Sequence, residues 1–384
     1  DRAGLRRQLH LHRWPVTILP SRTFLLAILA ATIAPGVSAQ VELRGGAFVE
    51  DPVVGVSAAG VAVERNGAAD MYGWHEVKRV GGEYEAAASA YARLSEDLWR
   101  ATARLERNDI YLAAPIFERL WTDAIANEND PQTLHAVRLV GPTGLAIARG
   151  VTAVRVAEGR LADAVESWAA SVALARAVAG DASGSVEALD PSLPPIFVQS
   201  VSVERLANSR APSVVARDPL ANAMFAWYRY SAERACGIDA EPPASAASSV
   251  DEQTVRFVSD LIMVRVAESG EQAGASARLR AIVEERAGDW REAWARAASG
   301  IAQVSDPKAR DRVSGALELM HIPARFAATQ PYLAGVALAW ASIALDAQGD
   351  AEHAASLRAE LEARFPESPA IGWLARRTGD GVEP

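Results

Sequence analysis

The feature that most constrains this chain is a helical period that runs from about residue 83 nearly to the C-terminus. Apolar residues recur there every three or four positions with charged residues between them, which is typical of amphipathic helices. In the first such segment, 83–107, one face carries Tyr84, Ala87, Ala88, Tyr91, Leu94, Leu98, Ala101 and Leu105. Alanine, which loses no side-chain entropy in a helix, supplies 79 of the 384 residues. We therefore expect a mainly α-helical protein.

Start and stop signals locate the individual helices. Asp218 and Pro219 form an N-cap and first-turn pair, and the segment 249–252 has the composition of a capping box. Pro115 lies either near the first turn of its helix or at a kink. The expected helices are 83–107, 110–126, 132–157, 161–178, 218–237, 250–268, 271–287, 289–303, 307–320, 331–348, 351–364 and 369–376.

The segment 40–81 has a different pattern, in which apolar and polar residues alternate. Val61 and Val63 alternate with polar or small neighbours, and Asn66-Gly67 provides a hairpin turn. We expect a small antiparallel β unit of three to five short strands, built as hairpins or a small barrel. About 40 residues are too few to be stable alone, so the unit should pack on the helices that follow, with Trp74 at the junction.

Composition divides the helical part into two blocks. The first block spans 82–240 and contains a proline-rich insertion at 181–217, within which 196–203 is weakly β-like. A linker rich in Pro, Ser and Ala follows at 241–249, and the second helical block spans 250–384.

The first 39 residues have the pattern of a secretory signal peptide. Five arginines precede an apolar run from Phe24 to Ala34, and Val37-Ser38-Ala39 offers a cleavage site before Gln40. The run is shorter than the roughly 20 apolar residues that span a bilayer. An uncleaved anchor is the alternative. We expect an exported protein, periplasmic or extracellular, with no transmembrane segment in the mature chain.

Charge argues against a nucleic-acid partner. The chain carries a net charge of −9. Without residues 1–39 it holds 34 basic and 47 acidic residues, which gives −13. A negatively charged chain repels a phosphate backbone, and proteins that bind nucleic acids have a basic surface. A nucleic-acid partner is therefore not expected.

A spacing recurs in the helical part: Gly or Asn at a turn, Ala five residues later, commonly a bulky residue four after that, and a small or apolar residue three further on. A tight turn between helices favours Gly, close helix approach favours Ala, and the bulky position fills the gap between neighbouring pairs. The five sets are Gly82, Ala87, Tyr91 and Leu94; Asn108, Ala113, Phe117 and Leu120; Gly159, Ala164, Trp168 and Ser171; Gly288, Ala293, Ala297 and Gly300; and Gly349, Ala354, Arg358 and Leu361, the last followed by Pro366. In the third set Ala164 should be buried and Ala170 exposed.

This spacing resembles the second half of a tetratricopeptide repeat. The resemblance implies an array of helix pairs with a surface for protein or peptide ligands. The five alanines are separated by 26, 51, 129 and 61 residues, whereas a regular array has a period of about 34. We therefore expect an irregular α-α helical repeat array that follows the β unit.

Motifs for enzyme chemistry are absent from the sequence. No two of the four histidines after residue 39 have the spacing of a helix-borne metal pair, and no nucleophile elbow, phosphate loop or dinucleotide fingerprint occurs. Cys236 is expected to be a small apolar residue near a helix end. We expect no cofactor, no metal and no catalytic residue.

One helix carries a surplus of aromatic residues, which are enriched at binding hot spots. Phe225, Trp227 and Tyr230 belong to this helix, whose apolar surface extends most of the way round. The helix is either buried in the array, the favoured interpretation, or it presents Phe225 and Tyr230 to a partner.

Two functions remain open. The first is a non-catalytic exported repeat protein that binds another protein or a peptide in the cell envelope. The alternative is an exported helical hydrolase acting on glycan or peptide, with its site near the 181–249 insertion, since loops of that length are often functional. Two carboxylates facing one deep pocket would favour the hydrolase. A shallow charged groove without such a pair would favour the binding protein.

Overall fold

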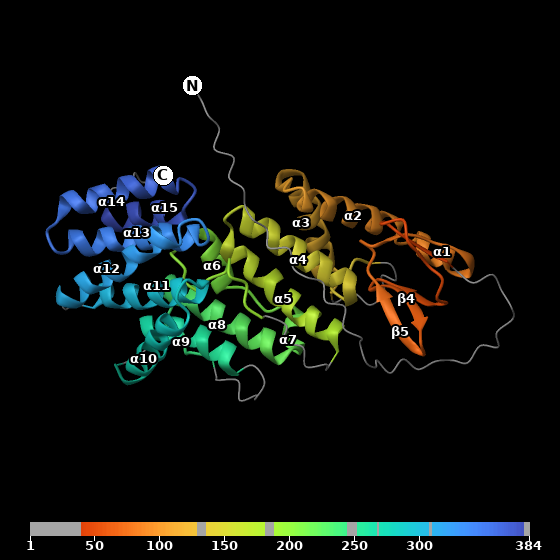
Figure 1. Cartoon of the computed structure of the whole chain (residues 1–384), viewed down its shortest axis with the longest axis horizontal. Coiled ribbons are helices and arrows are strands. Elements are labelled where there is room, and N and C mark those ends of the chain that lie inside the picture. The colour runs from red at the N-terminus through yellow and green to blue at the C-terminus, as the bar shows by residue number, and fades with distance from the viewer. Residues whose placement is uncertain are drawn as a thin grey trace, which may run out of the picture.

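The structure is a computed structural model that describes residues 40–128, 136–180, 188–243, 252–266, 269–306 and 309–379. The β unit lies at one end of an elongated molecule, and the last helices lie at the other (Figure 1). Between the two ends the helices stack side by side. The predicted signal peptide, the first three residues of the predicted capping box (249–251) and most of the 241–249 linker lie outside the described residues.

The β unit consists of two antiparallel three-stranded sheets, so it has six strands where three to five were expected. The first sheet has the order β2-β1-β6 and the second β3-β4-β5. The strands are β1 (Val41–Leu43), β2 (Phe48–Val49), β3 (Val53–Ser57), β4 (Gly60–Arg65), β5 (Ala68–Tyr72) and β6 (Val77–Val80).

The predicted turn and the predicted junction are both present. Asn66 and Gly67 take positive φ values of 54° and 76° and connect β4 to β5. Trp74 is buried and stacks on Tyr91 at a ring distance of 5.0 Å. Its backbone N–H donates to the hydroxyl of Thr143 at 2.9 Å. Trp74 therefore joins the β unit to two segments of the helical part.

The helical part begins with shorter elements than expected. In place of one helix over 83–107, a 3-10 turn η1 (Gly82–Tyr84) and α1 (Glu85–Ser89) precede α2 (Ala92–Glu106). The prediction was wrong at this point because Tyr91 leaves the helix to stack on Trp74.

The next two helices pack closely. They are α3 (Ile110–Ala126), with Pro115 inside it, and α4 (Gly141–Ala157). The predicted 132–157 helix was too long, because residues 136–140 are irregular and 129–135 lie outside the described residues. A Cβ at position 150 would lie 2.0 Å from the Phe117 ring, so only glycine allows this approach of α4 to α3.

The first block continues with α5 (Leu161–Ala179), α6 (Val201–Ala207), α7 (Ser213–Arg217) and α8 (Pro219–Ala235). The stretch 196–203 forms no strand, which corrects the expectation: it is extended to Ser200, whose hydroxyl then caps α6. Asp218 caps α8 as predicted, accepting from the N–H of Ala221. Cys236, half-buried, ends that helix.

The second block contains seven helices among the described residues. They are α9 (Glu252–Val266), α10 (Ser269–Glu285), α11 (Trp290–Ser305), α12 (Ala309–Arg325), α13 (Pro331–Asp346), α14 (Ala351–Arg364) and α15 (Pro369–Thr378). Sequential helices pack on one another from α9 to α14. The mainly helical fold with a small antiparallel β unit near the N-terminus agrees with the prediction.

The recurrent spacing marks real turns. Gly82, Asn108, Gly159, Gly288 and Gly349 all have φ between 60° and 87°, the left-handed region that such turns require. Of the five alanines, four are fully buried: Ala113, Ala164, Ala293 and Ala354. Tyr91, Phe117 and Trp168 are buried as expected, and Pro366 lies in the turn that follows α14.

Two alanines differ from the prediction. Ala87 is exposed and Ala88 is buried in its place, because the chain bends at Tyr91 and changes the face that α1 turns inward. Ala170 is fully buried where exposure was expected. The reason is that α5 has neighbours on several sides, including α4, α6, α7 and α8.

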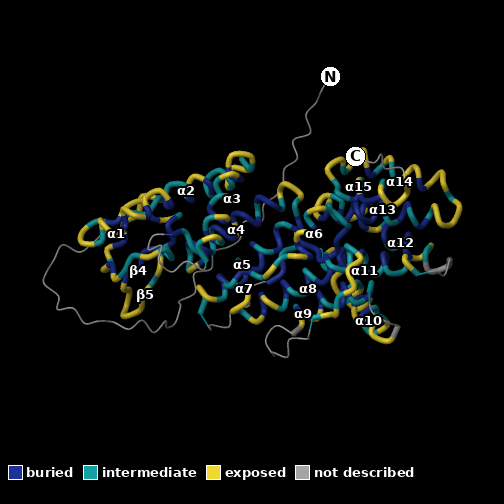
Figure 2. Tube along the Cα trace, turned by 180° about the vertical axis from the view of Figure 1, so that it is seen from behind, coloured by how far each residue is buried: buried dark blue, intermediate teal, exposed yellow. Residues whose placement is uncertain are grey.

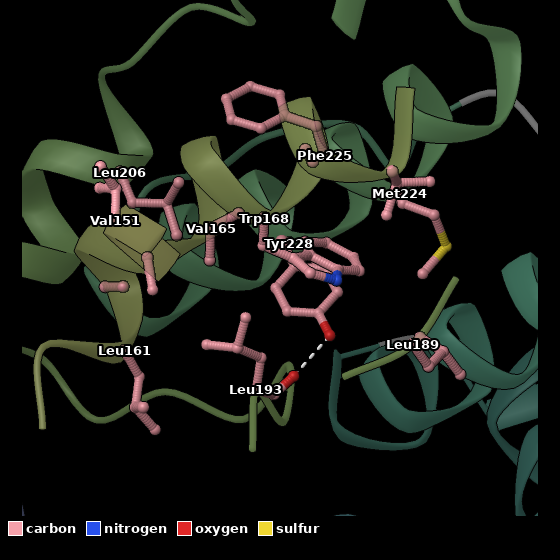
Figure 3. Close-up of a cluster of buried hydrophobic side chains, with 14 of the residues drawn as sticks. Val151, Leu161, Val165, Trp168, Leu189, Leu193, Leu206, Met224, Phe225 and Tyr228 are labelled. Atoms are coloured by element: carbon pink, nitrogen blue, oxygen red, sulfur yellow. Dashed lines mark hydrogen bonds between the residues drawn. The ribbon is translucent and has the colours of Figure 1, made fainter. Parts of the chain in front are cut away.

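The irregular segment 188–200 lies between the two blocks and is held by both. Its carbonyls at Leu193 and Pro195 accept hydrogen bonds from Tyr228 and Ser231 of α8 at 2.5 and 2.7 Å. Figure 3 shows the Tyr228 bond within the core around Trp168. From the second block, donors reach three further carbonyls: Gln330 to Pro191, Tyr332 to Ile196 and Arg376 to Gln199, at 3.0, 2.9 and 2.8 Å.

A continuous core accompanies these bonds. Buried residues extend through the interior from the β unit to α15, while exposed residues concentrate at turns and outer helix faces (Figure 2). The insertion is therefore part of the framework of the helical part.

Candidate functional site

A cavity of about 500 Å³ opens where α6 of the insertion meets α5, the end of α4 and the middle of α3. We name it the charged cleft. Its lining residues are Glu118, Arg155, Arg160, Ala162, Asp163, Glu166, Ser202, Arg205 and Leu206. Most of these residues belong to α5 and α6, which lie beside each other and close to α4 (Figure 1). Three arginines and three carboxylates thus share one cavity.

Helix periodicity places these side chains around the same cavity. On α5, Asp163 and Glu166 stand three residues apart and share a face. On α6, Ser202 and Arg205 do the same. The left-handed turn at Gly159 reverses the chain between α4 and α5, which brings Arg160 to the cleft beside Arg155.

Glu118 and Arg155 form the most enclosed pair in the cleft. The Arg155 guanidinium donates from Nε and Nη2 to the two oxygens of Glu118, at 2.9 and 2.7 Å. Its Nη1 donates to the Asp163 carbonyl at 2.6 Å. Burial favours the neutral form of Glu118, but hydrogen bonds and charge from Arg155 and Arg160 outweigh it and lower the pKa of this carboxyl.

Arg160 links this pair to Asp163. It donates to Glu118 at 2.5 Å, to Glu158 at 3.0 Å and to Asp163 at 3.3 Å. Desolvation would lower the pKa of Arg160, yet the Glu118 bond and the surrounding carboxylates raise it. Asp163 also accepts from the Ser202 hydroxyl at 3.2 Å and from Arg205 at 3.4 Å. A chain of alternating charges therefore runs from Arg155 to Arg205.

Glu166 differs from the other two carboxylates. Among the described residues it has no cation within ion-pair distance. Burial raises the pKa of the Glu166 carboxyl, and the Ser209 hydroxyl and the positive charges of Arg155 and Arg205 offset this only in part. The cleft thus contains one carboxylate that is not neutralised by an arginine.

The chemistry of the cleft is that of recognition by charge. Its lining has no aromatic side chain on which a sugar ring could stack. Both oxygens of Glu118 are occupied by arginines, so this carboxylate is a poor nucleophile or base. Within the described ranges, no group of three His, Cys, Asp or Glu residues is placed to hold a metal ion.

The structure removes the aromatic helix from consideration as a docking surface. Phe225, Trp227 and Tyr230 are all buried, and Trp227 packs edge-on against Tyr230 at 5.9 Å. Burial also raises the pKa of Tyr230. These three residues are part of the core, as the favoured interpretation of the helix had it, and are not presented to a partner.

The residues of the charged cleft were not predicted from the sequence. Gly159, Ala164 and Trp168 were assigned to the helix packing around α5, and the polar positions between them were given no role. A signal was present, because Asp163 and Glu166 are the only carboxylates of a helix that is otherwise almost wholly apolar or small. The hydrolase alternative located a site near 181–249, and one wall of the cleft, α6, does belong to that insertion.

No helix in the described part of the chain combines the length and hydrophobicity needed to cross a membrane. Comparisons of the chain with protein-family models, with curated proteins and with solved structures find no match.

Proposed function

We propose that this chain is an exported, tetratricopeptide-like helical-repeat protein without catalytic activity, which binds a protein or peptide of the cell envelope at the charged cleft. The observation that carries the proposal is the cleft itself: a cavity of about 500 Å³ with alternating arginines and carboxylates. Cavities of several hundred Å³ accommodate small ligands or short peptide segments.

The polar groups of the cleft are held in place before any ligand arrives. Arg155 and Arg160 are fixed by bonds to Glu118, and Arg205 by Asp163 and Ser202. Preorganised groups lose less conformational freedom on binding, so more of the interaction energy appears as affinity.

A filling substitution tests the location. Ser202 faces the cleft, whereas its neighbour Val201 is exposed on α6. The full chain and the Ser202→Trp and Val201→Trp variants would each be used to select peptides from a random-sequence display library. We expect the chain and Val201→Trp to enrich the same peptides and Ser202→Trp to lose them, at equal melting temperatures. Equal enrichment by all three proteins would place any binding outside the cleft.

A hydrolase acting on glycan or peptide is the second candidate, and one observation favours it. Glu166 and Glu118 line one cavity with pKa values shifted in opposite directions, which is a pattern of acid-base pairs. The arginines on Glu118 and the absence of an aromatic side chain from the cleft lining argue against it. Hydrolysis of envelope glycan or of peptide by the full chain, lost in Glu166→Gln and retained in Glu362→Gln, would establish this function in place of simple binding.

A further inference from the structure

We propose that the charged cleft recognises an alkylammonium group, supplied by a lysine side chain or by the amino terminus of a peptide, and that Glu166 is its counter-ion. This inference rests on the proposed function, since it names the chemistry of the ligand at the same site.

One carboxylate of the cleft takes no part in its ion pairs. Glu118 is paired with two arginines, and Asp163 is paired with Arg160 and Arg205. Glu166 lines the same cavity and, among the described residues, no arginine, lysine or histidine lies within 4.0 Å of its carboxylate. A carboxylate withdrawn from water without a cation is unfavourable, so a ligand that brings a positive charge gains energy there.

The arginines are less suited to capturing an anion. Arg155 already donates to both oxygens of Glu118 and to a backbone carbonyl, and Arg160 donates to three carboxylates. Arg205 holds Asp163 and Ser202. An anionic ligand would have to compete with these partners, whereas a cation at Glu166 would displace none of them.

Two further observations favour a compact cation. An ammonium group has three donors on a small, strongly hydrated centre, whereas a guanidinium is planar and larger. The cleft offers the Glu166 carboxylate and the Ser202 hydroxyl as acceptors beside the crowded guanidinium groups of Arg155, Arg160 and Arg205. The excess of 47 acidic over 34 basic residues after residue 39 attracts cationic ligands at long range.

The same geometry predicts a pH dependence. The charged groups that face Glu166 are Arg155 from α4, Asp163 from α5, Arg205 from α6, and Glu118 and Arg160 across the cavity. Asp163 and Glu118 form ion pairs with these arginines, whereas Glu166 does not. Binding of an ammonium group should therefore strengthen as pH rises through the titration of Glu166, and binding of a neutral ligand should not.

The test uses the full chain and three blocked or partly blocked peptides in calorimetric titrations. Acetyl-Gly-Lys-Gly-amide carries only the lysine ammonium, Gly-Gly-Gly-amide only the terminal ammonium, and acetyl-Gly-Gln-Gly-amide no charge. We expect at least one ammonium peptide to bind about tenfold more tightly than the neutral one, the difference made by one charge-assisted hydrogen bond. The tighter of the two ammonium peptides identifies the source of the group.

Matched variants complete the test. Glu166→Gln should lose this preference, while Glu362→Gln, an exposed position of α14, should keep it. The wild-type pH profile gives a second readout that needs no variant. Equal affinity for charged and neutral peptides, or a preference that survives Glu166→Gln, would overturn the inference. If peptides from the display library need Ser202 but contain no ammonium group, this inference is wrong and the proposed function stands. If the cleft binds no peptide, the inference and the proposed function both fail.

Discussion

At the scale of single residues, the charged cleft combines two kinds of arginine. The side chain of Arg155 is only 10% exposed and each of its three guanidinium nitrogens donates a hydrogen bond, whereas the side chain of Arg205 is 65% exposed. Exposed ion pairs contribute little because water screens them, but removing one partner of a buried pair leaves a charge without compensation. The two arginines should therefore differ in their contribution to stability although both line the same cavity.

Replacing each arginine by methionine tests this difference. Arg155→Met should lower the free energy of unfolding by about 2 to 4 kcal/mol, because Glu118 keeps only Arg160 and the Asp163 carbonyl loses its donor. Arg205→Met should change it by less than about 1 kcal/mol. Denaturant unfolding at neutral pH measures both. Equal effects of the two substitutions would show that the enclosed pair contributes no more than an exposed one.

Acid should reduce the difference in the free energy of unfolding between wild type and Arg155→Met. The pKa of Glu118 is lowered in the folded protein, so its stabilising contribution is present above the ordinary pKa of 4.5 and is lost as pH falls through the folded value. Unfolding curves measured between pH 7 and pH 3 should therefore converge at the acidic end. A gap that stays constant with pH would mean that Arg155 acts by packing alone.

The cleft residues also show which contacts could not be predicted from the sequence pattern. The cleft draws Glu118 from α3, Arg155 from α4 and Arg205 from α6, and no periodicity relates positions so far apart. Asp163 and Glu166, three apart on an apolar helix, could have been recognised as polar groups that need a cavity or partners. Which partners they meet depends on how the insertion folds back, and the sequence pattern did not predict that.

At the scale of secondary-structure elements, sequence signals located helices well where caps and turns are local. The helices 110–126 and 351–364 have the bounds that were predicted. Errors occur where tertiary contacts decide, as at Tyr91, which leaves the helix to stack on Trp74. The stretch 196–203 was misassigned because Ile196 and Val198 are buried between the two blocks rather than paired in a sheet.

Ala164 offers a test of the helix packing around α5. Its side chain is fully buried, so Ala164→Leu should lower the free energy of unfolding by about 1 to 3 kcal/mol through overpacking. Ala170→Leu should have a similar effect, because Ala170 is also fully buried. Ala355→Leu on the exposed face of α14 is the neutral control. Equal melting temperatures for all three variants would contradict the tight packing.

The β unit gives a second prediction at this scale. Trp74 is buried against Tyr91 and Thr143, which lie outside residues 40–81. An isolated 40–81 peptide lacks both contacts, and ordering each residue costs roughly 1.5 kcal/mol, so its small core cannot hold it folded. Circular dichroism should find the peptide disordered, while Trp74 in the full chain resists fluorescence quenching. A fragment that melts cooperatively would make the unit an independent module.

At the scale of the whole molecule, the first 39 residues bear on where the protein acts. Their arginines, apolar run and Val37-Ser38-Ala39 site predict cleavage before Gln40. Expression of the complete sequence in a bacterial host with two membranes should yield a periplasmic or secreted product. N-terminal sequencing of that product should begin at Gln40, whereas an intact N-terminus in the cytosolic fraction would contradict export.

We expect the segment 188–200 to make the two helical blocks unfold together. It accepts hydrogen bonds from α8 on one side and from Gln330, Tyr332 and Arg376 on the other, and the core is continuous through it. Calorimetry should therefore record one cooperative transition for the helical part. Two well-separated transitions would mean that the blocks behave as separate domains despite these bonds.

The Tyr332 hydroxyl tests the connection between the second block and the segment 188–200. Tyr332→Phe leaves the Ile196 carbonyl without its donor and should lower the free energy of unfolding by about 1 to 2 kcal/mol, since a polar group held away from water loses its partner. Burial raises the pKa of the Tyr332 phenol well above its ordinary value, which agrees with an enclosed hydroxyl. Tyr111→Phe, at a position 86% exposed, removes the same atom in water and should have no effect. If the two substitutions shift the melting temperature equally, the Tyr332 bond does not hold the second block to the segment 188–200.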